Sequence, residues 1–151
     1  MNFQCGQYLL QLDRPHIMGI VNVTPDSFSD GGRYTSVDLA VEHALKLIAD
    51  GADILDIGGE STRPGAEPVS LDEELNRVIP VISALAKQIK VPISIDTYKP
   101  EVMRASIEAG ADMVNDVQAL RMPGAVDDVA NSQAGVCLMH MQGEPKTMQL
   151  E

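Results

Sequence analysis

The chain has 151 residues, and its 22 Asp and Glu side chains against 11 Lys and Arg give a formal net charge of −11. This surplus of acid argues against nucleic-acid binding, which requires clustered Lys and Arg facing the phosphate backbone. No stretch reaches the roughly 20 apolar residues that a membrane-spanning helix needs, and the amino terminus lacks the layout of a signal peptide. We expect one cytoplasmic domain with no nucleic-acid partner and no membrane partner.

A hairpin and five strands are indicated in chain order. Residues 3–12 are typical of a small β-hairpin, which could plug one end of a barrel. The strands are expected at five short, continuous, β-branched runs, residues 17–23, 54–57, 93–95, 113–117 and 136–139. Runs of this kind are typical of parallel strands that are buried on both faces.

Helical segments are expected between these strands. An apolar stripe through residues 37–48 follows the i, i+3, i+4 spacing of a helix face that lies on a sheet. Ser70 with Glu73 predicts a capping box for the second helix. Pro80 predicts a break in that helix at the residue before it, because proline removes a backbone donor from a helix interior. Pro100 is expected to begin the third helix.

An internal repeat supports this alternation of strands and helices. Residues 51–56 (Gly-Ala-Asp-Ile-Leu-Asp) align with residues 110–115 (Gly-Ala-Asp-Met-Val-Asn), each a helix stop that runs into a strand. Repeated β/α units imply parallel strands with right-handed crossovers. The strand starts are about 30 residues apart, and a (β/α)8 barrel takes about 250 residues. We predict an α/β fold of the (β/α)8 TIM-barrel type, present here as about the first five β/α units of an incomplete barrel.

Polar side chains follow most of the predicted strands at their carboxyl ends. They are Asn22, residues 60–63, Asp96 with Thr97, Asn115 with Asp116, and His140. In parallel β/α folds ligands bind at this edge, because side chains from different strands converge there. For any one residue the competing explanation is that Asp and Asn end strands because they cap helices and begin turns.

Two polar, glycine-rich loops follow the first and second predicted strands. Residues 22–32 are too many for a minimal βα connection and predict a mobile active-site lid, with Phe28 set among Ser and Asp; a plain surface loop is the alternative. Residues 58–65 hold Arg63 between turn residues. Such an arginine can clamp a phosphate or carboxylate bidentately, or it can be an ordinary solvated side chain.

Five segments closely resemble motifs of bacterial dihydropteroate synthases. They are residues 18–32, 58–65, 95–97 with 99–100, 114–116 and 137–143. The motifs are long and nearly free of gaps, so the resemblance is specific and extends along the chain. It implies a (β/α)8-barrel transferase of folate biosynthesis, which joins a dihydropterin methyl diphosphate to 4-aminobenzoate and releases diphosphate, and which sulfonamides inhibit by competing with 4-aminobenzoate.

The resemblance implies a pterin site built on the later strands. The family's pterin-binding Asp corresponds to Asp96, whose carboxylate can accept two hydrogen bonds from the guanidine-like edge of a pterin. By the same resemblance, the side-chain amide of Asn115 is expected to donate and accept hydrogen bonds to the same heterocycle. Val117 and Met139 are expected to form part of the apolar wall.

The resemblance also implies an anion site served by the two loops. It places Mg²⁺ on the diphosphate with Asn22 as the protein ligand, the metal acting as a Lewis acid on the departing oxygens. Asp30 and Arg63 resemble the family pair that orders the lid. Asn22, Asp30, Arg63 and Asp96 are therefore the expected catalytic residues. Those expected around 4-aminobenzoate and diphosphate are Phe28, Thr62, Arg63 and Pro64.

The chain departs from the family pattern in lacking motifs that the family carries further along, among them a second pterin-binding Asp and an Arg-x-His strand. We therefore expect residues 1–151 to be the truncated amino-terminal portion of a pterin-binding domain, inactive or nearly so alone, from an enzyme that is a homodimer when full length. Two alternatives stay open. One is a non-catalytic half-barrel that self-associates through its uncovered edge strands; the other is a methyltetrahydrofolate-binding methyltransferase domain.

Overall fold

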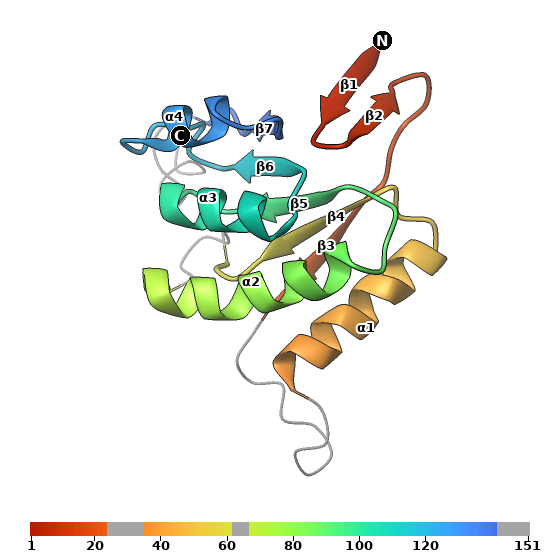
Figure 1. The fold of residues 1–151 in the computed structure, drawn as a ribbon, viewed down its shortest axis with the longest axis horizontal. Helices are drawn as coiled ribbons and strands as arrows, with labels where there is room; N and C mark the ends of the chain where they lie inside the picture. Colours follow the sequence, from red (N-terminus) through yellow and green to blue (C-terminus); the bar gives the residue numbers. More distant parts are fainter. Residues whose placement is uncertain (24–34, 62–66, 142–151) are drawn as a thin grey trace.

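A five-stranded parallel sheet with helices along one face forms the body of the molecule (Figure 1). The computed structural model describes residues 1–23, 35–61 and 67–141. The strands lie in chain order, β3 (Met18–Asn22), β4 (Ile54–Gly58), β5 (Ile93–Asp96), β6 (Met113–Asp116) and β7 (Gly135–Leu138). The helices are α1 (Ser36–Ala49), α2 (Leu71–Ala86), α3 (Pro100–Ala109) and α4 (Ala125–Ala130). The α/β prediction is confirmed, with each strand within one residue of the expected run at either end.

The main core lies between the sheet and the helices. Side chains that alternate along the strands pack against buried positions of the helices; the strand members of this core include Val21, Leu55, Ile57, Ile93, Ile95 and Val114. Because successive side chains of a strand point to opposite faces, the intervening residues point away from the helices. That second face, the inner face, is where a ligand can approach the sheet.

The first helix follows the predicted apolar stripe, with Ala40 and Ala44 buried. It begins with a capping box that the sequence analysis did not anticipate: Thr35 accepts a hydrogen bond from the Asp38 backbone, and Asp38 accepts one from the Thr35 backbone. At the second helix only half of the predicted box forms. Ser70 accepts a hydrogen bond from the backbone of Glu73, whose side chain pairs with Arg77 instead.

The predicted break in the second helix is wrong, because α2 runs continuously through Pro80. Pro80 and Asn76, whose carbonyl loses its helical partner, both lie on the exposed side of the helix, where water can replace the missing donor. The opposite side stays packed on the sheet through the buried residues Val78, Val81, Ile82 and Leu85. Tertiary burial thus outweighs the local cost of proline.

The repeated Gly-Ala-Asp segments tie neighbouring strands together at their amino-terminal ends. Asp53, just before β4, accepts a hydrogen bond from the backbone N–H of Ile17 at 2.9 Å, beside the start of β3. Asp112, just before β6, accepts one from the N–H of Ile93 at 3.0 Å, at the start of β5. The repeat in the sequence therefore corresponds to a repeated contact between strands.

The predicted hairpin is confirmed as β1 (Asn2–Cys5) paired with β2 (Tyr8–Gln11). Its turn lies at the amino-terminal ends of β6 and β7, where the Gly6 N–H donates to the Gln133 carbonyl at 2.9 Å. Gly6 has a φ of +55°, and a Cβ there would lie 2.5 Å from Asp112 Oδ1, so this close approach requires glycine. The hairpin thus occupies the end of the sheet opposite to the polar strand ends.

The two outer strands of the described sheet, β3 and β7, each pair with a single neighbour. Apolar side chains on them reach solvent, with Ile20 60% exposed and Leu138 48% exposed. Within the part of the chain that the structure describes, no helix is both long enough and apolar enough to cross a bilayer.

Candidate functional site

The register of the sheet brings three of the predicted site residues together. Asn22, Gly58, Asp96 and Asn115 are successive cross-strand partners at the carboxyl ends of β3 to β6, so their side-chain positions share the inner face. Gly58 keeps this row open, because a Cβ there would lie 3.7 Å from Asp96 Oδ2 and 3.8 Å from Asn22 Oδ1. Asn22, Asp96 and Asn115 therefore line one polar surface.

Asp56 lies two residues before Gly58 on β4, on the same face of the sheet, and it sets the orientation of Asn115. The Asn115 amide nitrogen donates to Asp56 Oδ2 at 3.0 Å. The amide nitrogen therefore faces Asp56, which leaves the amide oxygen for a donor on a ligand. Asp56 is itself buried, and burial raises its pKa while the hydrogen bond from Asn115 opposes that rise.

The carboxylate of Asp96 lies in a strongly acidic environment. Burial raises its pKa to about 7, and the like charges of Asp56, Glu74, Asp116 and Glu60 add to that rise. A carboxylate held in this state gains from any ligand that offers hydrogen-bond donors or positive charge to it. The site is therefore prepared for a donor-rich partner on the inner face of the sheet.

The two apolar residues predicted for the pterin wall lie at the ends of β6 and β7. Val117 is buried and Met139 is partly exposed. Their segments are joined, because the Met139 N–H donates to the Asp116 carbonyl at 3.1 Å. The Asp116 carboxylate also accepts from the N–H groups of Gln118 at 2.8 Å and Leu120 at 2.7 Å, which braces the turn after β6.

Five predicted site residues lie outside the described residues. Their roles therefore stay predictions; they are Phe28, Asp30, Thr62, Arg63 and Pro64. His140, noted at the last strand end, is exposed.

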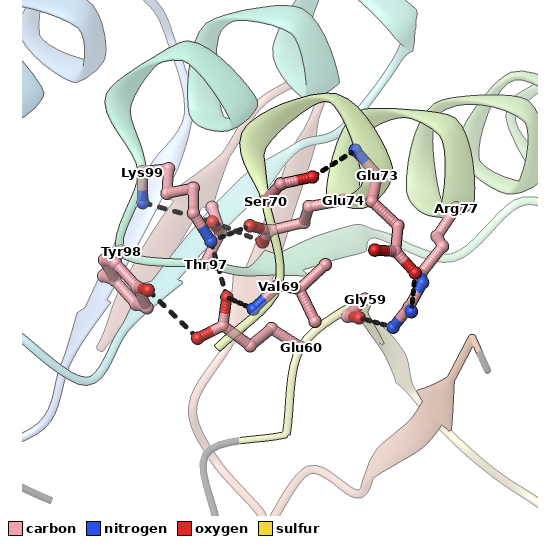
Figure 2. A network of polar contacts seen from close by, with 10 residues as sticks. All are labelled: Gly59, Glu60, Val69, Ser70, Glu73, Glu74, Arg77, Thr97, Tyr98 and Lys99. Atoms are coloured by element: carbon pink, nitrogen blue, oxygen red, sulfur yellow. Dashed lines mark hydrogen bonds and ion pairs between the residues drawn. The ribbon is translucent and has the colours of Figure 1, made fainter. Parts of the chain in front are cut away.

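The sequence did not predict a largely buried ionic network of Lys99, Glu60 and Glu74 (Figure 2). Lys99 Nζ lies 2.5 Å from Glu60 Oε2 and 2.5 Å from Glu74 Oε2, and Glu74 is 1% exposed. Burial lowers the pKa of the Lys99 ammonium, but the hydrogen bonds and charges of the two glutamates outweigh it and raise that pKa above its usual range. The network therefore holds a permanent cation between two anions.

The sequence did contain signals for these missed residues. Asp56 interrupts an otherwise apolar strand, and Glu74 falls on the apolar stripe of α2, with Val78 one turn further along. A charged residue at a core position is the informative exception to the rule that charges stay outside. What the spacing did not reveal is which partner each charge would meet.

A cavity of about 450 Å³ opens beside the row, lined by residues that follow β3 and β4 and by Glu73 and Arg77 of α2. Asn22 and Gly58 reach it, but neither Asp96 nor Asn115 lines it. We therefore place the polar ligand surface on the inner face of the sheet and treat the cavity as a neighbouring space. Its volume falls in the range of small-molecule sites.

The donor set offers little to a metal by itself. Among the residues that the structure describes, no group of three or more His, Cys, Asp and Glu side chains is arranged to hold a metal ion. Asn22 contributes one amide oxygen, a hard ligand of the kind that Mg²⁺ prefers, and the nearby carboxylates create a negative field. This arrangement fits a Mg²⁺ that arrives with oxygen ligands of its own.

Comparison with known proteins assigns the chain to a family. The family model described as pterin binding enzyme matches residues 18–151. The dihydropteroate synthase of Escherichia coli K12 is 59% identical over 140 residues, which cover 93% of this chain and 50% of that protein. The chain thus spans about half the length of the curated relatives it matches.

Solved structures agree in fold. A Xanthomonas albilineans dihydropteroate synthase with 4-aminobenzoic acid superposes with a TM-score of 0.88 at 63% identity, covering 94% of this chain and 52% of that one. The dihydropteroate synthase from Xanthomonas albilineans in complex with 7,8-dihydropteroate superposes with a TM-score of 0.84 at 58% identity, covering 94% of this chain and 52% of that one. On the family match, the polar row at the strand ends and these similarities, the chain belongs to the pterin-binding enzyme family.

Proposed function

We propose that residues 1–151 are the amino-terminal portion of the pterin-binding domain of a dihydropteroate synthase, a transferase that condenses (7,8-dihydropterin-6-yl)methyl diphosphate with 4-aminobenzoate. The observation that carries this proposal is the row of Asn22, Asp96 and Asn115 on the inner face of the sheet. Support comes from similar proteins named dihydropteroate synthase and from the product complex of one of them.

Pterin recognition falls to Asp96 and Asn115 in this proposal. The amino group and ring N–H of the pterin donate to the Asp96 carboxylate, which becomes fully ionised when it gains these donors. Asn115, held by Asp56, presents its amide oxygen to the same ring. Val117 and Met139 supply apolar contacts to the ring faces.

The diphosphate side of the site is assigned to Asn22, with Mg²⁺ as cofactor. When bound, the metal neutralises charge that develops on the departing diphosphate oxygens. Asn22 would provide one ligand and the substrate and water the others, which suits the single amide oxygen found there. Asp30 is proposed to lie near the metal and to pair with Arg63, while Phe28, Thr62, Arg63 and Pro64 border 4-aminobenzoate.

The reaction is a substitution at a CH₂ group. The amine nitrogen of 4-aminobenzoate forms the new C–N bond, the C–O bond to diphosphate breaks with its electrons, and the amine releases one proton to solvent. No protein nucleophile is required, so catalysis rests on orientation and on charges placed around the methylene and the leaving group. The homodimeric state of the full-length enzyme and its cytoplasmic location are part of this proposal.

Two assays test the proposal. In a chimera that joins residues 1–151 to the carboxyl-terminal half of the E. coli relative, we expect Mg²⁺-dependent dihydropteroate formation, whereas the purified chain alone should show little or none. Titration calorimetry of the chain should detect pterin diphosphate binding, weakened about 30-fold or more in Asp96→Asn because a charge-assisted bidentate contact is lost. Asp50→Asn, which changes an exposed carboxylate at the C-cap of α1, serves as the control.

The opposite results would count clearly against the proposal. A chimera that is folded but inactive, together with a chain whose pterin affinity is the same in Asp96→Asn and Asp50→Asn, would remove the assigned role of the polar row. Robust turnover by the purified chain would instead refute the expectation that it is inactive alone.

A further inference from the structure

The ammonium of Lys99 joins three separate segments of the chain (Figure 2). Glu60 belongs to the loop after β4, Glu74 to the first turns of α2, and Lys99 to the turn between β5 and α3. Both carboxylates lie 2.5 Å from Nζ, and all three side chains are largely withdrawn from water. Removing one partner of a shielded ion pair costs far more than removing one partner of an exposed pair, because the remaining charge stays buried without compensation.

Glu60 is fixed from several directions at once. Its Oε1 accepts a hydrogen bond from the Tyr98 hydroxyl at 3.0 Å, and its Oε2 accepts one from the Val69 N–H at 3.2 Å. Lys99 also lies over the Tyr98 ring, with Nζ 4.5 Å from its centre. The end of β4 is therefore fastened to the turn after β5 and to the residue before the α2 cap.

Glu74 reaches the residue that follows Asp96. The Thr97 hydroxyl donates to Glu74 Oε1 at 2.7 Å and accepts from the Lys99 N–H at 3.2 Å. The Thr97 N–H donates to the Asn115 carbonyl at 3.2 Å. Through Thr97, Glu74 and its partner Lys99 hold the end of β5 against the end of β6.

We propose that Lys99 is a positioning residue: its contacts with Glu60 and Glu74 hold the tips of β4 and β5 so that Asp96 faces the pterin. This inference rests on the proposed function, because it assigns Lys99 a role toward the same ligand. Lys99 acts through Glu74 and Thr97 rather than by touching the ligand. Replacing it with a neutral side chain leaves the buried Glu74 without its cation, and the turn that follows Asp96 loosens.

A purely structural role makes a different prediction. If Lys99 only adds stability, a variant that is still folded binds the pterin as the parent does. If Lys99 positions Asp96, the folded variant binds more weakly and the Thr97 amide exchanges faster with solvent. Affinity per folded molecule, and Thr97 exchange compared with that of protected amides far from the site, therefore separate the two roles.

The experiment compares Lys99→Met with Lys46→Met in this chain. Lys46 pairs with Asp50 on the surface of α1 at 2.7 Å, so the control makes the same chemical change away from the site. With the folded fraction checked by circular dichroism, we expect Lys99→Met to bind (7,8-dihydropterin-6-yl)methyl diphosphate about tenfold more weakly and to speed Thr97 amide exchange about tenfold. Lys46→Met should change neither by more than about twofold.

Glu60→Gln covers the case in which Lys99→Met does not fold. Glutamine removes the negative charge that faces Lys99 and keeps one acceptor oxygen, while its amide nitrogen takes the place of the other oxygen. For Glu60→Gln we expect pterin affinity to fall and Thr97 exchange to speed up, each by about threefold. Folded variants with parental affinity and parental Thr97 exchange would overturn the positioning role. If the parent chain binds no pterin and the chimera is also inactive, the proposed function fails, and the Thr97 exchange rates still decide whether Lys99 holds the tip of β5.

Discussion

At the scale of single residues, the site places carboxylates where their charges are costly. Asp96 lies near the carboxylates of Asp56, Glu74, Asp116 and Glu60, and among the described residues the largely buried ammonium of Lys99 pairs with two of these carboxylates. An arrangement of this kind is suited to a ligand that brings hydrogen-bond donors, and it lowers the stability of the chain when no ligand is present. Function and stability therefore oppose each other at Asp96.

This opposition predicts a pH-dependent effect of Asp96→Asn. The pKa of Asp96 rises from 3.8 to about 7 in the folded chain, so the folded state binds more protons than the unfolded state between these values. The free energy of unfolding of the parent should fall as pH rises through this window, whereas asparagine does not titrate. Chemical denaturation measures the free energy of unfolding of Asp96→Asn minus that of the parent. We expect this difference to increase by about 2 kcal/mol in favour of Asp96→Asn between pH 5 and pH 8.

The surface variant Asp50→Asn provides the reference for that measurement. Its stability relative to the parent should be nearly the same at both pH values, since Asp50 is exposed and pairs only with Lys46. A stability difference for Asp96→Asn that does not grow between pH 5 and pH 8 would contradict the raised pKa of Asp96 in the folded chain.

At the scale of elements, α2 shows how packing overrides local preference. Its sequence carries a proline in the interior, yet the helix continues because its opposite face is buried against the sheet. The same helix brings Glu74 to the network and Arg77 to the Gly59 carbonyl, which accepts a hydrogen bond from it at 2.7 Å. A break at Pro80 would not disturb these contacts, since both lie in the half of α2 that precedes it.

Pro80→Ala should therefore stabilise the chain. The substitution restores the hydrogen bond to the Asn76 carbonyl on the exposed side. We expect the free energy of unfolding to rise by about 1 to 2 kcal/mol. The gain is smaller than the full cost of a proline inside a helix, because alanine also increases the conformational entropy of the unfolded chain. Urea denaturation measures this change, and pterin affinity should stay at the parental value. A loss of stability would mean that the proline ring makes a packing contact that alanine cannot replace.

At the scale of the whole molecule, the described sheet ends in two uncovered strands. Ile20 on β3 and Leu138 on β7 expose apolar surface on strands that have a single strand neighbour among the described residues. Open edges of this kind favour pairing with another chain. The self-associating half-barrel considered from the sequence is therefore compatible with the structure as a property of the chain by itself, alongside the proposed enzyme role.

We predict that the purified chain associates at concentrations of about 10 to 100 μM, as species with uncovered strand edges do. Sedimentation velocity should show the association, and Ile20→Lys with Leu138→Lys should shift the chain toward monomer. Val126→Lys, which changes an exposed apolar residue on α4 away from both edges, is the matched control. A compact monomer with both edge strands protected from hydrogen exchange would contradict this prediction.

The fold and part of the site follow from local patterns in the sequence. Short apolar runs, the repeated Gly-Ala-Asp segments and the polar residues at strand ends predicted parallel β/α units and an edge where Asn22, Asp96 and Asn115 meet. These patterns are readable because each depends on residues close together in the chain, and parallel strands bring their carboxyl ends to one edge.

The partners of the buried charges were decided only by the tertiary structure. Asp56 meets Asn115 from 59 positions away, and Lys99 meets Glu60 and Glu74 from 39 and 25 positions away. No spacing rule encodes such contacts, because they arise when separate units pack side by side and a charge taken out of water must find a partner within reach. The sequence by itself determined the units and the edge at which they act; their packing determined what holds Asp96 there.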